Sequence, residues 1–556
     1  MCCSSKCVEV IDSSNRYPEN HGDRVNNLRD VLKSKNSTNI ENKKKFTSDQ
    51  KILLKKGEKA MELGNYTDAI EIYKELIIQY PDDENGYFNL GKIYISLKLY
   101  ENALEMFDLV IEKNKTSSCY YLNKGVCEFN LRKYNEAIES FNKGLFLDQT
   151  DSNLYLNKGC AYNHLKKYPE AIESFKSGIL LNSKDPSLYN NLGVSYFRQE
   201  EYEKSIEFYD EAIKLDSSDP LPINNKGVSL KSLKKYKEAL ECFDQAIKVA
   251  PDEPVSYYNK GNTYKILEDY DSALQNFDKA INLNPKYVNA YYNKGLTLNN
   301  LGRYYEAIDN FDMCLKFNKK FAHAYLNKGI SLDIINKSEE AILQYDKAIE
   351  INPKFAEAYL NKGITLYNLN NYEEAIQNYN KAIELNDKMA TAYNNKGVCL
   401  YKLKRYDEAI ENYTLALAIE PNYLDVYINR GTCYKTQKKI FEAIEEFDHA
   451  LEIKADYALG YYNKGMAYNM LKGEENARQA IELLDFAIKY KEDYVDAYFN
   501  KGCIQMNLGE YVEALQTFNK CKEYKNDEDK ELEDKIQECN KMVNKEISEI
   551  SEENEN

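Results

Sequence analysis

The sequence contains no tryptophan and only four histidines among its 556 residues. None of these histidines has the cysteine or carboxylate spacing of a metal site, so we expect no metal and no cofactor. No apolar run approaches the roughly 18 residues that a membrane-spanning helix needs. The first residues, MCCSSKCVEVIDSSN, also lack the apolar core of a secretory signal, and we expect no transmembrane segment.

Positive charge is also scarce. The chain carries 74 Lys and Arg against 90 Asp and Glu, a net charge of −16, which repels a phosphate backbone. We therefore expect no nucleic acid among its partners. Its 13 cysteines are odd in number and irregular in spacing, a pattern typical of free thiols in a reducing compartment. This favours an intracellular, cytoplasmic protein.

What the sequence does have is a strict period of 34 residues, marked by glycine. A fixed period of this size indicates an array of units that bury their apolar faces against their neighbours. We expect fourteen repeats, because a last glycine, Gly502, follows the series after 37 residues. The regularly spaced glycines are Gly57, Gly91, Gly125, Gly159, Gly193, Gly227, Gly261, Gly295, Gly329, Gly363, Gly397, Gly431 and Gly465.

Each unit has the pattern of two amphipathic helices, as residues 288–321 illustrate. Tyr291, Gly295 and Leu298 share one side of a first helix, and Tyr304, Ala307 and Phe311 share one side of a second. Gly302 lies between the two stripes and favours a short turn. The repeat is thus predicted to be a helical hairpin.

The repeat resembles the tetratricopeptide repeat. With the glycine as position 8, position 4 is Tyr in twelve of fourteen units, position 20 is Ala in all but one, and position 24 is aromatic in all but one. The resemblance implies an all-α, right-handed α-solenoid (superhelix) of helix-turn-helix hairpins. Small residues at positions 8 and 20 allow the two helices to approach closely.

The repeat pattern divides the chain into four segments. Residues 1–46 are expected to be a disordered tail, and residues 50–528 the fourteen repeats. Repeat 13 carries three extra residues within KGEENAR, expected to lengthen its turn or its first helix. Residues 529–548 are predicted to form a solvating C-terminal capping helix, and residues 549–556 a frayed tail.

Position 6 of the repeat is Asn in thirteen of fourteen units, and we call these residues the asparagine ladder. On a helical wheel they lie opposite the packing stripe, on the face that the resemblance places in a concave groove. One amide can pair with both polar groups of a peptide backbone, so these residues are candidates for binding extended polypeptide. The ladder comprises Asn89, Asn123, Asn157, Asn191, Asn225, Asn259, Asn293, Asn327, Asn361, Asn395, Asn429, Asn463 and Asn500.

Aliphatic residues at position 9 are candidates for the same groove. They would offer apolar pockets beside the amides. Two alternatives remain open: the apolar row helps helix packing, and the ladder is a by-product of tandem duplication in an Asn-rich chain. The apolar candidates are Val194, Val228, Leu296, Ile330, Ile364 and Val398.

The ladder is similar to the one in the repeat region of the O-linked N-acetylglucosamine transferase family, which holds extended polypeptides. The catalytic domain of that family is missing here. The carboxylate clamp of chaperone-binding repeats is disfavoured, because Leu54 and Glu58 occupy positions where the clamp has Lys and Asn.

These features predict a non-enzymatic scaffold or adaptor that binds extended segments of other proteins. The alternatives are a substrate-presenting or regulatory subunit of a modifying-enzyme complex, and a structural spacer in a large assembly. Membrane association is expected only if Cys2, Cys3 and Cys7 are acylated. The sequence has neither a myristoylation glycine nor a neighbouring membrane segment to support that modification.

Overall fold

Helices form every regular element in residues 48–525 and 530–555, the part of the chain that the computed structural model describes. The expected tail at residues 1–46, with Cys2, Cys3 and Cys7, lies outside the described residues. The chain divides between Thr297 and Leu298 into two units. Helix α16 (Val288–Asn300) contains this division.

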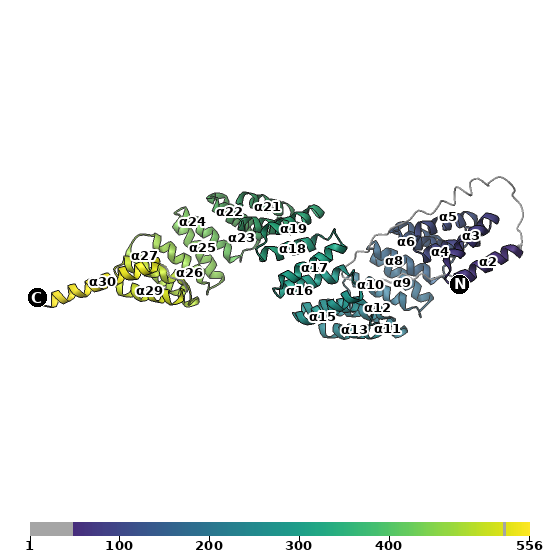
Figure 1. Cartoon of the computed structure of the whole chain (residues 1–556), viewed down its shortest axis with the longest axis horizontal. Helices are drawn as coiled ribbons and strands as arrows, with labels where there is room; N and C mark the ends of the chain where they lie inside the picture. Colours follow the sequence, from purple (N-terminus) through teal and green to yellow (C-terminus); the bar gives the residue numbers. More distant parts are fainter. Residues whose placement is uncertain (1–47, 526–529, 556) are drawn as a thin grey trace. The chain divides into compact units, whose positions relative to one another are not determined.

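The first unit consists of consecutive helices (Figure 1). Even-numbered helices of 13 residues, or 15 in α2, alternate with odd-numbered helices of 14 residues. They are α2 (Ser48–Glu62), α3 (Tyr66–Gln79), α4 (Glu84–Ser96), α5 (Tyr100–Lys113), α6 (Ser118–Asn130), α7 (Tyr134–Leu147), α8 (Ser152–His164), α9 (Tyr168–Leu181), α10 (Pro186–Arg198), α11 (Tyr202–Leu215), α12 (Pro220–Ser232), α13 (Tyr236–Val249), α14 (Pro254–Ile266) and α15 (Tyr270–Leu283).

The second unit repeats the same alternation and ends in a longer helix. It contains α17 (Tyr304–Phe317), α18 (Ala322–Ile334), α19 (Ser338–Ile351), α20 (Ala356–Asn368), α21 (Tyr372–Leu385), α22 (Ala390–Lys402), α23 (Tyr406–Ile419), α24 (Leu424–Thr436), α25 (Ile440–Ile453), α26 (Ala458–Met470), α27 (Glu474–Tyr490), α28 (Val495–Asn507), α29 (Tyr511–Tyr524) and α30 (Lys530–Glu555). Helix α30 runs through residues 549–555, where we had expected a frayed tail.

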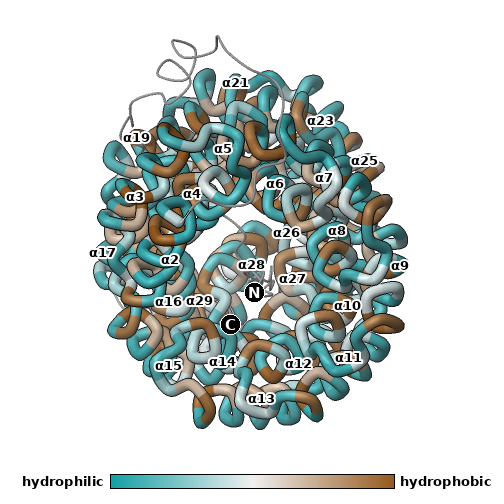
Figure 2. Tube along the Cα trace, turned by 90° about the vertical axis from the view of Figure 1, so that its right-hand side faces the viewer, coloured by the Kyte–Doolittle hydropathy of each residue, from teal (hydrophilic) through white to brown (hydrophobic). Residues whose placement is uncertain are grey.

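From α2 to α15 in the first unit and from α18 to α29 in the second, each even-numbered helix packs most closely against the odd-numbered helix that follows it, and each such pair packs on the next pair of its unit. The predicted helix-turn-helix solenoid is therefore confirmed. We call the even-numbered member the first helix and the odd-numbered member the second helix of a hairpin. Apolar and polar stretches alternate along the tube (Figure 2), as expected of helices with one buried face.

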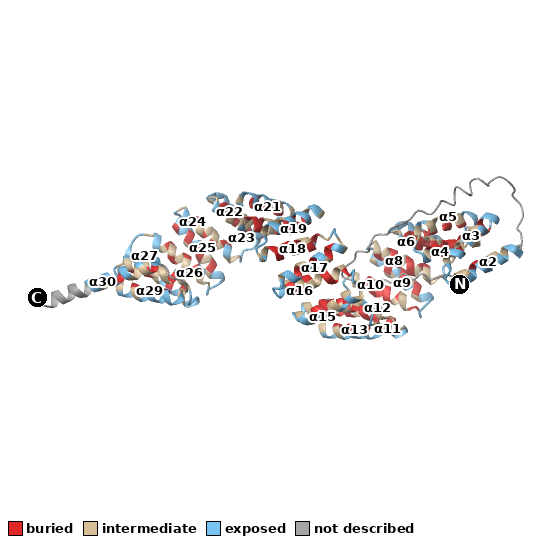
Figure 3. Ribbon diagram, in the orientation of Figure 1, coloured by how far each residue is buried: buried red, intermediate tan, exposed pale blue. Residues whose placement is uncertain are grey.

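The repeat glycine is needed for close contact between the two helices of a hairpin. A Cβ atom on Gly125 would lie 2.4 Å from the Phe141 ring, and one on Gly227 would lie 2.6 Å from the Phe243 ring. The aromatic residue at position 24 thus fills the space that a side chain would take. The buried residues concentrate where the helices meet, whereas the turns are exposed (Figure 3).

The turn inside the hairpin contains one residue in the left-handed conformation. Gly302 has φ of 72°, as the sequence predicted, but most repeats place a non-glycine residue there, such as Glu200 with φ of 64° and Lys234 with φ of 60°. An L-amino acid pays about 1–2 kcal/mol for this conformation. The turn geometry is therefore imposed by the packing of the two helices rather than by glycine.

The three extra residues of repeat 13 lengthen its second helix. Helix α27 has 17 residues, whereas α25 and α29 have 14, and the first helix α26 keeps the usual 13. The expectation of a longer turn or first helix is wrong. Gly473 adopts φ of 121° directly before Glu474 and Glu475, so the helix starts early with acidic residues at its positive end.

Candidate functional site

The asparagine ladder lies on the first helices, from α4 to α28. Six of its side chains are buried, contrary to the expectation that the whole row faces away from packing contacts. The first helices of successive hairpins contact one another, as α8 and α10 do, so the neighbouring hairpin covers part of this face. The buried members are Asn123, Asn157, Asn191, Asn225, Asn259 and Asn463.

The ladder amides bind their own chain in two ways. Most donate from Nδ2 to the backbone carbonyl four residues earlier, as Asn157 does to Asn153 at 2.9 Å and Asn361 to Glu357 at 2.7 Å. Such a bond stays within one helix and holds the amide plane in place. The Oδ1 lone pairs are then the part of the side chain that can accept a hydrogen bond from a ligand.

Other ladder amides join successive hairpins through a second asparagine row at position 5. Asn225 donates to Oδ1 of Asn190 at 3.0 Å, and Asn259 donates to Asn224 at the same distance. Asn429 repeats this contact with Asn394 in the second unit, also at 3.0 Å. Sequence reasoning missed this row. The signal was present in the consecutive Asn pairs 190–191, 224–225 and 394–395.

The remaining ladder residues are half-buried, so their side chains keep part of their surface exposed to solvent. In the second unit, four of them follow one another in consecutive repeats. The structure therefore separates the predicted ladder into a structural part and an accessible part. The half-buried members are Asn89, Asn293, Asn327, Asn361, Asn395, Asn429 and Asn500.

The apolar row at position 9 divides in the same way. Val194 is fully buried and Val228 is 3% exposed, so packing accounts for both. Leu296 in the first unit is half-buried. Ile330, Ile364 and Val398, in the second unit, are also half-buried. They stand in the same repeats as Asn327, Asn361 and Asn395, and the accessible amides and accessible aliphatic side chains therefore occur together.

Lysines at position 7 form a regular series of ion pairs between hairpins. In eight repeats the lysine Nζ contacts an aspartate 16 residues earlier, on the second helix of the preceding hairpin; Lys226–Asp210 is 2.6 Å and Lys362–Asp346 is 2.6 Å. Six further pairs have the same spacing. They are Lys124–Asp108, Lys260–Asp244, Lys294–Asp278, Lys328–Asp312, Lys464–Asp448 and Lys501–Asp485. These lysines connect repeats, a role that the sequence analysis did not identify.

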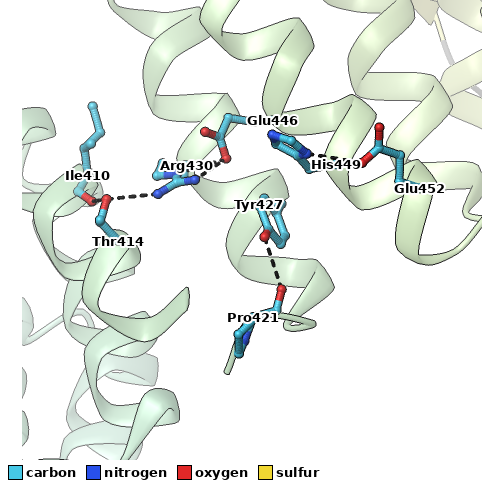
Figure 4. Close-up of polar contacts among 8 residues, drawn as sticks. All are labelled: Ile410, Thr414, Pro421, Tyr427, Arg430, Glu446, His449 and Glu452. Atoms are coloured by element: carbon cyan, nitrogen blue, oxygen red, sulfur yellow. Dashed lines mark hydrogen bonds and ion pairs between the residues drawn. The ribbon is translucent and has the colours of Figure 1, made fainter. Parts of the chain in front are cut away.

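Arg430 replaces the lysine in one repeat and makes different contacts (Figure 4). Thr414 stands where other repeats have aspartate and accepts a hydrogen bond of 3.0 Å from Arg430 Nη1. Arg430 also pairs with Glu446 at 2.8 Å, an acid on the second helix of its own hairpin. Burial raises the pKa of the Glu446 carboxyl, and the Arg430 guanidinium opposes that rise. This charge pair is therefore a packing feature of the hairpin.

A second exposed surface lies on the second helices α7 and α9. Phe146 is 86% exposed and Leu180 is 87% exposed, at equivalent positions of neighbouring repeats. The same position is Lys214 and Lys248 in the next two repeats. A depression of about 530 Å³ beside Phe146 is lined also by Tyr121. Large exposed apolar side chains in neighbouring repeats are typical of a contact surface.

No group of three or more metal-ligating side chains occurs in the described ranges, 48–525 and 530–555. Within those ranges, no helix is both long and apolar enough to cross a bilayer.

His164 stacks on Tyr134 with ring centroids 4.8 Å apart, and burial lowers the pKa of its imidazole. This histidine thus has a packing role.

Family models for the tetratricopeptide repeat match residues 159–219, 223–309, 335–457 and 495–528 in successive segments. A model described as anaphase-promoting complex, cyclosome, subunit 3 matches residues 62–144. No curated protein matches the sequence.

Three solved structures are similar to the chain. The APC/C hetero-tetramer Cut9–Hcn1 is 15% identical, with a TM-score of 0.41, and the match covers 81% of this chain and 95% of that one. MamA is 20% identical, with a TM-score of 0.29 and coverages of 31% and 93%. YrrB, described as a TPR protein with an unusual peptide-binding site, is 29% identical, with a TM-score of 0.28 and coverages of 34% and 96%.

Proposed function

The chain belongs to the tetratricopeptide-repeat family, and from that premise we propose that it is a non-catalytic scaffold that binds extended segments of other proteins. The binding surface that we propose is formed by the first helices α18, α20 and α22 of the second unit. The observation that carries the proposal is the coincidence of accessible amides and accessible aliphatic side chains on these three helices.

The chemistry of this surface suits an extended backbone. Asn327 and Asn361 each use Nδ2 within their own helix, at 2.9 Å and 2.7 Å, so each amide is held in a fixed orientation. An amide oxygen held in this way can accept from a peptide N–H without reading its side chain. Ile330 and Ile364, one turn further along, supply apolar contact for the alternate side chains of the peptide.

The test uses the full chain and whichever partner co-purifies with it. Asn327→Ala/Asn361→Ala is expected to weaken affinity for that partner by about tenfold to a hundredfold, since each hydrogen bond contributes about 0.5–1.5 kcal/mol. The matched control is Asn310→Ala/Asn378→Ala. Those two asparagines are also half-buried and bond the carbonyl four residues earlier, but they lie on second helices.

The two double variants should melt at similar temperatures, because both remove the same kind of intrahelical bond. Loss of affinity in the first variant alone supports binding at the first helices. Equal affinity in both variants and in the wild type would reject the ladder as a binding site.

A second candidate function, a spacer that contacts its assembly through second helices, is favoured by Phe146 and Leu180. Their exposure on α7 and α9 gives it a specific surface. Phe146→Lys/Leu180→Lys, which restores the residue type of the following repeats, would abolish that contact. It would leave the Asn327 and Asn361 surface unchanged, so the two functions can be separated.

A further inference from the structure

Position 12 of the repeat is lysine in three repeats, at Lys231, Lys265 and Lys435, and two of these lysines donate a hydrogen bond to a ladder asparagine. These two are Lys265 on α14 and Lys435 on α24, one in each unit, each four residues after the repeat glycine. Lys265 Nζ donates to Oδ1 of Asn293 at 2.6 Å, and Lys435 Nζ donates to Oδ1 of Asn463 at 3.2 Å. Each lysine thus contacts a ladder asparagine of the next hairpin.

Neither lysine has an anionic partner within the described ranges. Burial lowers the pKa of both ammonium groups, and no neighbouring charge contributes to the shift. Burying an ammonium without a counter-ion costs free energy, which is why partly buried lysines are usually paired. Eight of the position-7 lysines follow that rule, as Lys226 does with Asp210 at 2.6 Å.

The asparagine amides hold the two ammonium groups in place. Asn293 Nδ2 donates to the Asn289 carbonyl and to the Tyr258 hydroxyl, both at 3.1 Å, so its oxygen is directed at Lys265. Asn463 Nδ2 donates to the Leu459 carbonyl at 3.0 Å. A lysine ammonium has three donors, and the asparagine accepts only one. Two N–H groups of each ammonium remain to bind a ligand or water.

Packing alone does not require a cation at position 12. Other repeats have Ile95, Tyr367 or Met506 there, and these residues are also half-buried. A position that accepts aliphatic, aromatic and thioether side chains can be filled without charge. The charge at Lys265 and Lys435 therefore calls for a functional explanation.

We propose that Lys265 with Asn293, and Lys435 with Asn463, each receive a carboxylate side chain of an extended acidic segment of a partner protein. This inference rests on the proposed function and specifies in addition that the bound partner segment is negatively charged. The partner's carboxylate supplies the counter-ion that the fold omits, and charge complementarity then selects acidic segments among extended ones. Asn293 and Asn463 act as positioning residues, since they direct the ammonium groups.

The experiment measures binding of two labelled peptides to the full chain by fluorescence anisotropy. The first peptide alternates Val and Glu over about nine residues, and the second has Gln in place of each Glu. The wild-type protein is expected to bind the Glu peptide at least about tenfold more tightly, which corresponds to about 1.4 kcal/mol. The preference should shrink as salt rises.

The variant Lys265→Met/Lys435→Met should bind both peptides with equal affinity. The matched control Lys279→Met/Lys438→Met removes two exposed lysines of the same two repeats and should keep the preference for Glu. The Lys265 and Lys435 substitutions remove half-buried charges that lack a counter-ion, so that variant should melt at the same temperature as the wild type or higher. A melting curve thus separates lost recognition from lost folding.

Three results would overturn the inference: equal affinity of the wild type for the two peptides, a preference that survives Lys265→Met/Lys435→Met, or no binding of the Glu peptide. Equal affinity for both peptides leaves the proposed function standing, because backbone binding does not depend on the charge of the side chains. Loss of binding in Asn327→Ala/Asn361→Ala tests that function separately.

Discussion

The division of the asparagine ladder into buried and accessible members makes a quantitative prediction about stability. Asn225 is fully buried and donates a 3.0 Å hydrogen bond to Asn190 across two hairpins. Asn225→Ala removes that bond and leaves the buried Asn190 oxygen without its donor, which costs about 1–3 kcal/mol. Alanine returns about 0.5 kcal/mol through helix propensity. We expect a loss of about 2 kcal/mol.

The comparison variant is Asn361→Ala. Asn361 is half-buried, and its amide bonds only the Glu357 carbonyl of its own helix, at 2.7 Å. That carbonyl is within an α-helix, so removing the side chain leaves no buried group unpaired. We expect the stability to change by no more than about 0.5 kcal/mol, because alanine favours the helix.

The assay must report local stability, since repeat arrays unfold in segments rather than in one step. Hydrogen exchange of the amides in α10, α12 and α14 gives the opening free energy around Asn225, and exchange in α18, α20 and α22 does the same for Asn361. The double variant Asn190→Ala/Asn225→Ala should cost less than the sum of its single variants. Equal losses for Asn225→Ala and Asn361→Ala would refute the assignment of buried and accessible members.

Three further predictions concern the contacts that build the hairpins. Gly227→Ala should destabilise α12 and α13 by about 1 kcal/mol in urea unfolding, because overpacking against Phe243 at 2.6 Å outweighs the gain in helix propensity. Glu200→Gly should stabilise the protein by about 0.5–1 kcal/mol in the same assay, because its φ of 64° strains any residue other than glycine. Asp210→Asn should remove about 0.5–1 kcal/mol by breaking the 2.6 Å pair with Lys226, and denaturation in high salt should abolish that difference.

The pKa of Lys265 also predicts how stability depends on pH. Its folded-state pKa is lower than its unfolded-state pKa, so the unfolded chain binds more protons between the two values. The contribution of Lys265 to stability therefore rises as the pH rises through that alkaline window. Lys265→Met should remove this dependence, which urea denaturation at a series of alkaline pH values would measure. A wild-type protein and a variant with identical pH profiles would contradict the burial of the ammonium.

Much of the fold could be predicted from the sequence because it depends on contacts that recur with the repeat. The glycine at position 8 and the aromatic residue at position 24 meet within one hairpin, as Gly125 and Phe141 do. All units but the one at Gly465 supply the same pair at the same spacing, so 34-residue periodicity implies helical hairpins that stack in order. The helix-turn-helix architecture follows directly.

Features that depend on the fit between neighbouring elements could not be predicted in this way. From the sequence, the extra residues near Gly473 could have lengthened either helix or the turn. In the structure they belong to α27, because Gly473 adopts a conformation outside the helix and two glutamates directly after it stabilise the helix start. A left-handed turn residue such as Glu200 gives no sequence signal, because the helix contacts on either side impose its φ.

The candidate site shows the same limit most clearly. A helical wheel places Asn225 and Asn361 on the same face of their helices. It describes one helix at a time and leaves out the neighbouring helices that could cover that face. The tertiary structure decides that the first helices around Asn225 cover its amide, whereas Asn361 stays partly accessible. Sequence thus determined which residue stands at each position of the repeat, and the packing of one hairpin on the next decided which of those residues a partner can reach.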